Sequence, residues 1–575
     1  MDFATPIDEP IVQRFINRHR LHKIDPSAER SEAREPIIYY LDPGTPEPIR
    51  SALLEGASWW NQAFEAAGFI NAFQVKILPP EADPMDVRYN LIQWVHRSTR
   101  GWSYGNSVTD PRTGEIIKGH VSLGSLRARH DLLIAEGLLQ PYTENQAPPP
   151  ALMNMVLARI RQLSAHEVGH TLGLRHNYAA SVTQNASVMD YPHPKVTLDV
   201  TGEINLSEAY PSGIGAYDQQ AIKYGYREFA PGTDEAKALE SILSQTRDNG
   251  LLYITDQDAR PSGGAHPFAH LWDNGLNAAT ELNRLMEIRR ILLDRFSPAA
   301  LRPGAPMAQL EEALVPIYLC HRYQVDAASK LIGGLDYTYA IKGDGQLTTR
   351  FISPPEQRKA LAALLATLSV DALSLPPDLL EQIATRPPGY PLSRETFARR
   401  TSPEFDPLSA AETAADLTLN YLLNPIRANR LVLHHARDPR QPDLVEVLDR
   451  LIEATWQQDR RTSYPGEIQR VIDKAVLYGL MHLATSTQAS DQARALVFLQ
   501  IERLRQWIRS QSSTATESAQ QAHLLYSTHQ IDRWLDDPTK FTAPPRSSPP
   551  DGSPSAMARI SAENTDLNLF TTETE

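Results

Sequence analysis

The stretch HEVGHTLGLRH, residues 166–176, constrains this chain more than any other feature of its sequence. His166 and His170 are four residues apart, so on a helix both side chains lie on one face and can bind one metal ion. Glu167 follows the first histidine and is placed beside a water molecule bound to that metal. We therefore predict a metal-binding helix that begins after the prolines at residues 148–150 and carries both histidines.

Gly173 is the expected end of this helix, because glycine enters the positive-φ region without a steric cost. A sharp exit from the helix lets His176 turn back as a third ligand. Three neutral imidazoles leave a fourth position for water, which is typical of catalytic zinc sites. Water bound there has a pKa near 7, and Glu167 is the candidate general base that takes its proton. The sequence thus predicts one Zn²⁺ per chain.

Composition excludes several classes of protein. A chain of 575 residues is expected to form about three to four domains. The 56 Lys and Arg residues against 69 Asp and Glu give a net charge of −13, which argues against a nucleic-acid partner. Cys320 is the single cysteine, so no intrachain disulfide can form. We expect no transmembrane segment and no signal peptide, because long apolar runs and a basic, apolar start are both absent.

Hydrophobic periodicity predicts an α/β unit followed by many helices. Strands are expected at residues 37–41, 73–77, 88–96 and 114–123, with a long helix between the first two that stops at Gly68. Helices are expected near residues 235–248, 275–296, 307–332, 355–369, 408–436, 444–458, 466–486, 490–511 and 515–535. A hairpin is expected where residues 336–341 and 346–351 flank a KGDG turn.

Met189 and Tyr191 stand shortly after the third histidine, in the stretch SVMDY. The motif HExxHxxGxxH followed by such a methionine resembles the metzincin clan of zinc endopeptidases. The resemblance implies Met189 as the Met-turn residue beneath the metal and Glu167 as the general base. Tyr191 matches the tyrosine that astacin-like and serralysin-like members use as an extra zinc ligand or oxyanion donor. The zinc ligands implied are His166, His170 and His176.

More narrowly, residues 5–350 resemble bacterial zinc-dependent metalloproteases with an EcxA-like zinc-binding domain. The stretches that carry this resemblance include RHRLHKIDP, SWWNQAFEAAGF, TDPRTGEIIKG and KLIGGLDYTYAIKGDG. Members of that group are usually longer at the N-terminus and have export signals there, so the resemblance implies a periplasmic or extracellular location and a truncated form. Asn177 departs from astacins, which have Glu at this position, so astacin substrate preference is not transferred.

The resemblance implies an α+β metzincin (zincin-like) catalytic domain, with a mixed twisted sheet and an active-site helix, followed by a largely α-helical C-terminal region. We expect five parts. They are an N-terminal arm or remnant of a preceding domain at 1–36, a metzincin-like zinc protease domain at 37–228, a mostly helical extension with a hairpin at 229–350, a helical domain at 351–537, and a Pro/Ser-rich tail at 538–575.

The strand at residues 114–123 is the expected substrate-binding edge of the sheet, if the metzincin resemblance holds. An edge strand has unpaired N–H and C=O groups, so an extended peptide can add to it as another strand. We expect Gly119, His120 and Val121 to form this edge. Gly119 either allows close approach of the substrate backbone or marks a bulge.

The predicted function is that of a zinc-dependent endopeptidase acting on peptide or protein substrates, with the oligomeric state left open. The alternatives are a catalytically silent zincin-like binding or scaffolding protein and a zinc amidohydrolase. Asp256 and Asp258 lie in an oxygen-rich stretch that resembles a calcium loop, but the stretch lacks the full ligand series, so calcium is possible there but not expected. Three further side chains were considered, namely His120 and His193 as extra ligands and Ser164 as a hydrolase nucleophile without the GxSxG context.

Overall fold

The computed structural model of the protein describes residues 2–97, 103–143, 147–183, 185–513, 515–538, 544 and 547–550. Its strands are β1 Ser31–Glu32, β2 Ile37–Leu41, β3 Phe69–Ile70, β4 Phe73–Ile77, β5 Asn90–Val95, β6 Tyr104–Thr109, β7 Ile116–Gly124, β8 Thr197–Leu198, β9 Ile204–Asn205, β10 Leu335–Asp336 and β11 Arg350–Phe351. Its helices up to residue 329 are α1 Ile49–Ser58, α2 Trp60–Ala66, α3 Leu126–Leu139, α4 Pro150–Thr171, α5 Ala216–Tyr226, α6 Glu235–Asp248, α7 Asp256–Ala259, α8 Ala278–Asp294, α9 Leu310–Tyr318 and α10 Arg322–Ser329. The later helices are α11 Pro354–Ala366, α12 Val370–Leu373, α13 Pro377–Gln382, α14 Pro407–Leu422, α15 Pro425–Arg437, α16 Leu444–Ala454, α17 Ser463–Thr485, α18 Asp491–Ser512 and α19 Ser518–Asp536.

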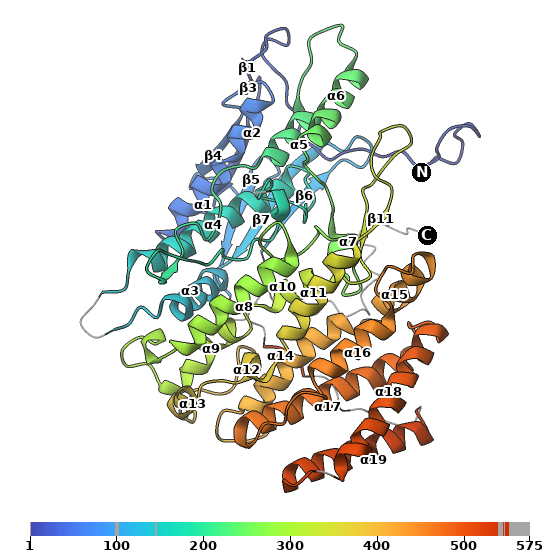
Figure 1. Ribbon diagram of the computed structural model, residues 1–575. Coiled ribbons are helices and arrows are strands. Elements are labelled where there is room, and N and C mark those ends of the chain that lie inside the picture. The colour runs from blue at the N-terminus through green and yellow to red at the C-terminus, as the bar shows by residue number, and fades with distance from the viewer. Residues whose placement is uncertain are drawn as a thin grey trace.

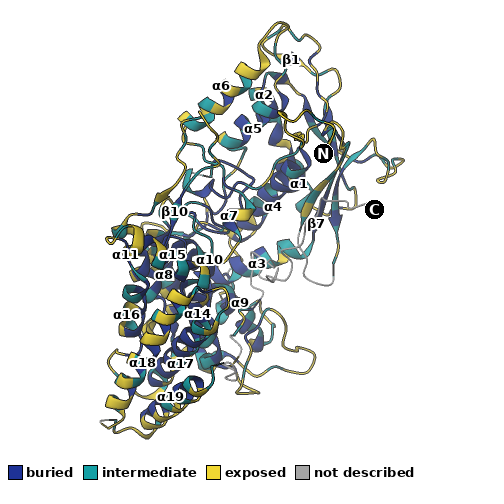
Figure 2. Cartoon of the chain, turned by 90° about the vertical axis from the view of Figure 1, so that its right-hand side faces the viewer, coloured by how far each residue is buried: buried dark blue, intermediate teal, exposed yellow. Residues whose placement is uncertain are grey.

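The elements form an α+β part and a helical part, which Figure 1 shows one above the other. The main sheet and helices α1, α2, α4 and α5 make up the upper part, and helices α8 to α19 make up most of the lower part. Figure 2 shows the same two parts after a quarter turn, with buried residues where the helices meet. The α+β class predicted for the first part is confirmed.

The main sheet has five strands in the order β4-β2-β5-β7-β6. β2 is parallel to both β4 and β5, and β5 is parallel to β7. β6 alone is antiparallel to its neighbour, so the sheet is mixed, as predicted. β2 alternates buried residues with half-buried ones, whereas β5 and β7 contain consecutive buried residues, as inner strands do; both patterns are recognisable in the sequence.

The prediction that Gly119, His120 and Val121 form the edge of the sheet is wrong. β7 is an inner strand, in which Val121 pairs with Ile92 of β5 on one side and with Gly105 of β6 on the other. The edge is β6, which the sequence analysis missed. Its sequence YGNSVT has few apolar residues, and every second residue is exposed, so it lacks the signal by which half-buried strands are recognised.

Helix α4 lies against α1 and against the strands β6 and β7. Gly56 of α1 allows the close approach of the two helices, because a β-carbon there would overlap the main-chain carbonyl of Arg161. The buried indole of Trp60 donates from Nε1 to the carbonyl oxygen of Ala165 at 2.8 Å. These contacts fix α4 at the level of its last two turns.

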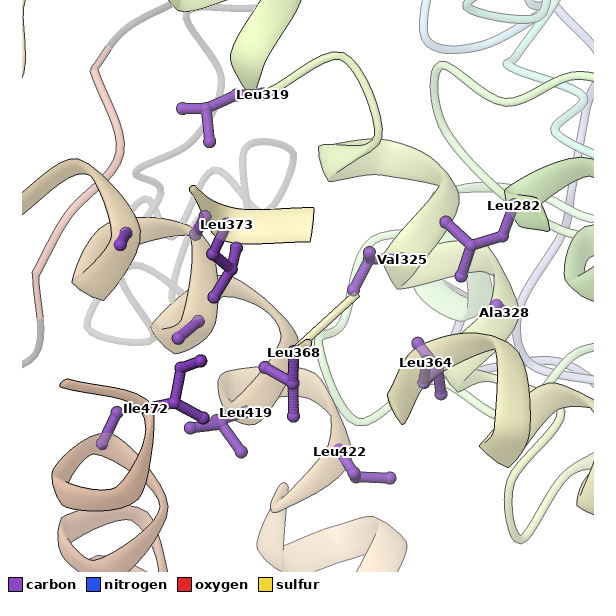
Figure 3. Close-up of a cluster of buried hydrophobic side chains, with 14 of the residues drawn as sticks. Leu282, Leu319, Val325, Ala328, Leu364, Leu368, Leu373, Leu419, Leu422 and Ile472 are labelled. Carbon is purple, nitrogen blue, oxygen red and sulfur yellow. The ribbon is translucent and has the colours of Figure 1, made fainter. Parts of the chain in front are cut away.

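The helical part packs around a continuous apolar core, drawn in Figure 3. Leu282 of α8, Val325 of α10, Leu364 of α11 and Leu419 of α14 are all buried there. Three helices predicted as continuous are each broken, namely the long one before Gly68 into α1 and α2, the one at 307–332 into α9 and α10, and the one at 408–436 into α14 and α15. The last break has a clear cause, because the side chain of Asn424 caps a new helix that begins at the following proline.

Two further differences concern shorter elements. α3 was not predicted from the sequence. The predicted hairpin pairs only at its base, through Leu335 with Phe351 and Asp336 with Arg350. Among the described residues no single helix is long and apolar enough to cross a membrane, while the bent pair Pro354–Ala366 and Val370–Gln382 meets the criterion by length and composition.

Candidate metal centre

Helix α4 carries His166 and His170, and the chain turns back directly after its end. Gly173 has a φ of 96°, a backbone conformation that residues with a β-carbon rarely adopt. A β-carbon at this position would also clash with the carbonyl oxygen of Asn17. The N-terminal arm therefore packs against the turn that brings His176 to the other two histidines.

The Nε2 atoms of the three imidazoles converge. Nε2 of His170 lies 3.2 Å from Nε2 of His166 and 3.2 Å from Nε2 of His176. Nitrogen ligands at about 2.0–2.1 Å from a tetrahedral zinc are about 3.3–3.4 Å apart, so the observed spacing fits this ion. Within the part of the chain that the structure describes, this is the one group of three or more His, Cys, Asp or Glu side chains placed to hold a metal ion.

Each imidazole Nδ1 has an acceptor of its own. The pairs are His166 with the Val188 carbonyl at 2.8 Å, His170 with the Leu174 carbonyl at 2.9 Å, and His176 with the Asp256 carboxylate at 2.9 and 3.0 Å. Because these acceptors assign the proton to Nδ1, three Nε2 lone pairs face one another, which a cation between them stabilises. Burial lowers the pKa of all three histidines, to about 3 for His170, so they are neutral ligands at pH 7.

Asp256 and Asp258 do not converge as a calcium site would require. Asp256, at the start of α7, accepts from His176, whereas Asp258 accepts from the hydroxyls of Tyr337 at 2.5 Å and Tyr339 at 2.6 Å. Asp256 belongs to the metal centre, and no local pattern could show this, because 80 residues separate it from His176.

Arg260 links Asp256 to two tyrosines. Its Nε donates to the Asp256 carboxylate, and its Nη2 donates to the hydroxyls of Tyr178 at 2.6 Å and Tyr191 at 3.2 Å. Burial alone raises the pKa of Asp256, but the hydrogen bond from His176 and the charge of Arg260 hold it well below its ordinary value. Asp256 is thus an anion behind a metal-binding histidine, where it orients the ring and raises its basicity.

The Asp256→Asn protein is expected to bind zinc about 10- to 100-fold more weakly, because the amide removes the charge behind His176. Competition with a zinc-binding dye measures this change. Asp258→Asn is the matched control, since Asp258 lies two residues away and accepts from Tyr337 and Tyr339. Equal zinc affinity of Asp256→Asn and wild type would contradict the role given to Asp256.

Glu167 is buried beside the histidines and faces the edge strand. Burial raises its pKa to about 8, which the charge of Arg159 and the N–H of Gly105 partly oppose. Gly105 belongs to β6, and a β-carbon there would overlap the main-chain carbonyl of Glu167. Glycine is therefore required where the edge strand crosses the helix. The arrangement places a carboxyl group between three converging imidazoles and an open strand edge.

Met189 packs beneath the histidine-bearing helix. It is fully buried, and a β-carbon on Gly169 of α4 would overlap its sulfur. The backbone N–H of Asn177 donates to the backbone carbonyl of Met189 at 3.0 Å, which connects the turn around Met189 to the segment after His176. The ring of Tyr191 lies 4.8 Å from that of His176, between centroids. Met189 therefore lies beneath α4, and Tyr191 lies beside His176.

The remaining side chains considered from the sequence lie elsewhere. His120 bonds to Gln93 at 3.2 Å, and His193 contacts the carbonyl of Pro194 at 3.2 Å. The hydroxyl of Ser164 donates to the carbonyl of Leu53 at 2.7 Å, within the helix packing. None of the three joins the converging histidines.

This arrangement defines a zincin-like domain. A helix carries two histidines, a glycine turn brings a third to them, a methionine lies beneath them, and the helix packs against a mixed sheet. The Met-zincin family model matches residues 149–463, more than half of the chain, and the chain therefore belongs to this family. The match includes the histidine helix, the Met-turn segment and the helices up to the start of α17. No curated protein matches the chain. No solved structure matches it either.

Proposed function

We propose that this protein is a zinc-dependent endopeptidase in which Glu167 is the general base. The observation that carries the proposal is a buried carboxyl group adjacent to three imidazoles whose lone pairs converge. Zinc held by His166, His170 and His176 would polarise a peptide carbonyl and lower the pKa of a bound water to near 7. A protein that used this metal only for folding would have no need of Glu167.

In this proposal Glu167, Tyr191 and Arg260 have different roles in peptide hydrolysis. In its ionised form, which the charge of Arg159 and that of a bound cation would favour, Glu167 accepts the proton of the attacking water and passes it to the amine that leaves as the peptide bond breaks. Tyr191 keeps its proton, because burial raises its pKa, and its O–H can donate to the oxyanion that develops. Arg260 holds the Tyr191 hydroxyl by the bond at 3.2 Å and so acts as a positioning residue.

The test of this proposal is cleavage of denatured casein and of a quenched random peptide library by the purified chain. We expect internal bonds to be cut, activity to stop with a chelator, and activity to return with zinc. Cleavage of simple non-peptide amides alone would favour the amidohydrolase. Absence of hydrolysis by the zinc-loaded chain would overturn the proposal in favour of a binding or scaffolding protein.

Strand β6 is the edge to which an extended substrate can add. The N–H of Gly105 faces Glu167 and not β7. In an antiparallel pair the residues alternate, so Ser107 also directs its N–H away from β7. A peptide paired with this edge would present its carbonyl carbon to the groups around Glu167.

Ser107→Pro is expected to raise KM and lower kcat/KM by about 10-fold, because proline removes one edge N–H donor. The change is tolerated structurally, since proline is found at strand edges whose N–H faces outward. Ser107→Ala keeps the N–H and is the control. Peptide kinetics measure both proteins, and equal kcat/KM values would mean that the substrate binds elsewhere.

A further inference from the structure

A buried guanidinium lies two turns before the zinc-binding histidines on the same face of α4. Arg159 precedes His166 by seven residues, which is about 10 Å along the helix axis. Its side chain is 2 % exposed, and its Nε has no hydrogen-bond partner. The one acceptor that it reaches among the described residues is Oε1 of Gln162, on the same helix. Arg159 thus carries a buried charge that no described carboxylate pairs with.

Another buried arginine in this chain is used differently. Arg289 donates from Nε to the carbonyl of Tyr318 at 2.7 Å and from Nη1 to the carbonyl of Ala372 at 2.6 Å. It thereby joins segments that are distant in the sequence. Arg159 makes no hydrogen bond to a distant segment among the described residues, and its distant neighbours are the rings of Tyr210 at 5.8 Å and Trp272 at 5.6 Å. Burying a guanidinium is costly unless it is paired. The fold therefore leaves Nε of this buried guanidinium without a hydrogen-bond acceptor.

Contacts connect Arg159 to the proposed catalytic cleft. Its guanidinium lies 5.6 Å from the ring of Trp272, and Trp272 stacks on Tyr191 with centroids 4.7 Å apart. Its acceptor Gln162 lines a cavity of about 310 Å³. That cavity is also lined by Val188, Asp190 and Pro192, which surround the Met-turn. An acceptor that enters this cavity therefore meets Gln162, whose Oε1 accepts a hydrogen bond from Arg159.

We propose that Arg159 selects substrates with an aspartate or glutamate side chain within three residues of the bond that is cut, an inference that rests on the proposed endopeptidase function. Without substrate, Oε1 of Gln162 occupies the position in which an oxygen of the substrate carboxylate binds to Arg159. Nε2 of Gln162 keeps its bond to the Val188 carbonyl, at 3.1 Å, when Oε1 is displaced. A carboxylate is the better acceptor, because charge-assisted hydrogen bonds are about twice as strong as neutral ones.

Asp190 is the acidic group that shares the cavity wall. Its oxygens accept from the backbone N–H groups of Ser181 at 3.0 Å and Tyr191 at 2.7 Å. Each oxygen of Asp190 is therefore already engaged by a backbone N–H group of its own.

The test uses pairs of quenched peptides that differ by Glu or Gln at one position, for the three positions on each side of the scissile bond. We expect the wild type to prefer Glu by about 10- to 100-fold in kcat/KM at one position. Arg159→Met is expected to reduce this ratio to about one with zinc content unchanged. Arg161→Met is the matched control, because Arg161 lies on the same helix and pairs with Glu55 at 2.6 Å.

A second variant covers the case in which Arg159→Met fails to fold. Gln162→Glu supplies an internal carboxylate to Arg159, so it is expected to fold and to lose the preference for Glu peptides. Equal kcat/KM for every Glu and Gln pair with wild type would overturn the proposal, and so would a preference that survives Gln162→Glu.

The same peptide pairs separate this proposal from the endopeptidase function. Their binding to zinc-loaded Glu167→Gln protein is measured by fluorescence anisotropy, which requires no hydrolysis. If Glu peptides bind more tightly than Gln peptides but wild type cleaves neither, the endopeptidase proposal is wrong and the role of Arg159 is supported. If wild type cleaves and binds Glu and Gln peptides equally well, the endopeptidase proposal is supported and the role of Arg159 is contradicted.

Discussion

The Glu167→Gln protein is expected to lose at least ~100-fold in kcat on any peptide that the wild type cleaves, while it still binds one zinc per chain. Glutamine has the size of glutamate but cannot accept the proton of water. The site also tolerates an uncharged group, because burial already raises the pKa of Glu167 to about 8. We therefore expect no loss of thermal stability. Peptide kinetics, metal analysis and a melting curve on one preparation measure the three quantities.

Glu55→Gln is the control for this substitution. Glu55 is on α1 and pairs with Arg161 at 2.6 Å on the exposed side of α4, away from the histidines. It should retain wild-type kcat. If Glu167→Gln protein remains active within a few fold, the carboxyl group is not the base and the proposed mechanism falls.

The metal-binding side chains could be predicted because they are local. His166, His170 and His176 lie within eleven residues, and the helix period and the positive φ of Gly173 are sufficient to bring them together. No long-range information enters this step. Their placement therefore depends on backbone geometry that the sequence states directly.

The rest of the site depends on contacts between distant segments. Asp256 and Arg260 reach His176 and Tyr191 from a loop about 70 to 80 residues away, and Trp272 arrives from still further along the chain. A single acidic or basic residue in a loop carries no periodic signal, so its partner cannot be read from the sequence. Tertiary packing decides these contacts.

The missed edge strand has a related cause. β6 gains its position from pairing with β7 and from the fit of Gly105 over the main chain of Glu167, not from its own apolar residues. A strand that is open to solvent on one edge needs little hydrophobic sequence. Because the sequence of β6 shows no strand pattern, β7 is the strand that the sequence places at the edge, although it is an inner strand.

The His170→Ala protein is expected to lose its stoichiometric zinc, because Nε2 of His170 is the nitrogen close to both of the other two. Two imidazoles without the third leave an incomplete site. Wild type should contain one zinc per chain, and the variant close to none. Zinc at 100 times its dissociation constant should also stabilise wild type by about 2.7 kcal/mol and leave the variant unaffected. Metal analysis and melting curves with and without zinc measure both effects.

His120→Ala is the matched control for the loss of zinc. His120 lies on β7 and bonds to Gln93, so its removal takes away an imidazole without touching the converging nitrogens. This protein should bind zinc as wild type does. Stoichiometric zinc in His170→Ala would place the ion on other side chains. The pairing of each Nδ1 with an acceptor would then be ordinary hydrogen bonding in a buried cluster, and the proposed catalysis would lose its metal.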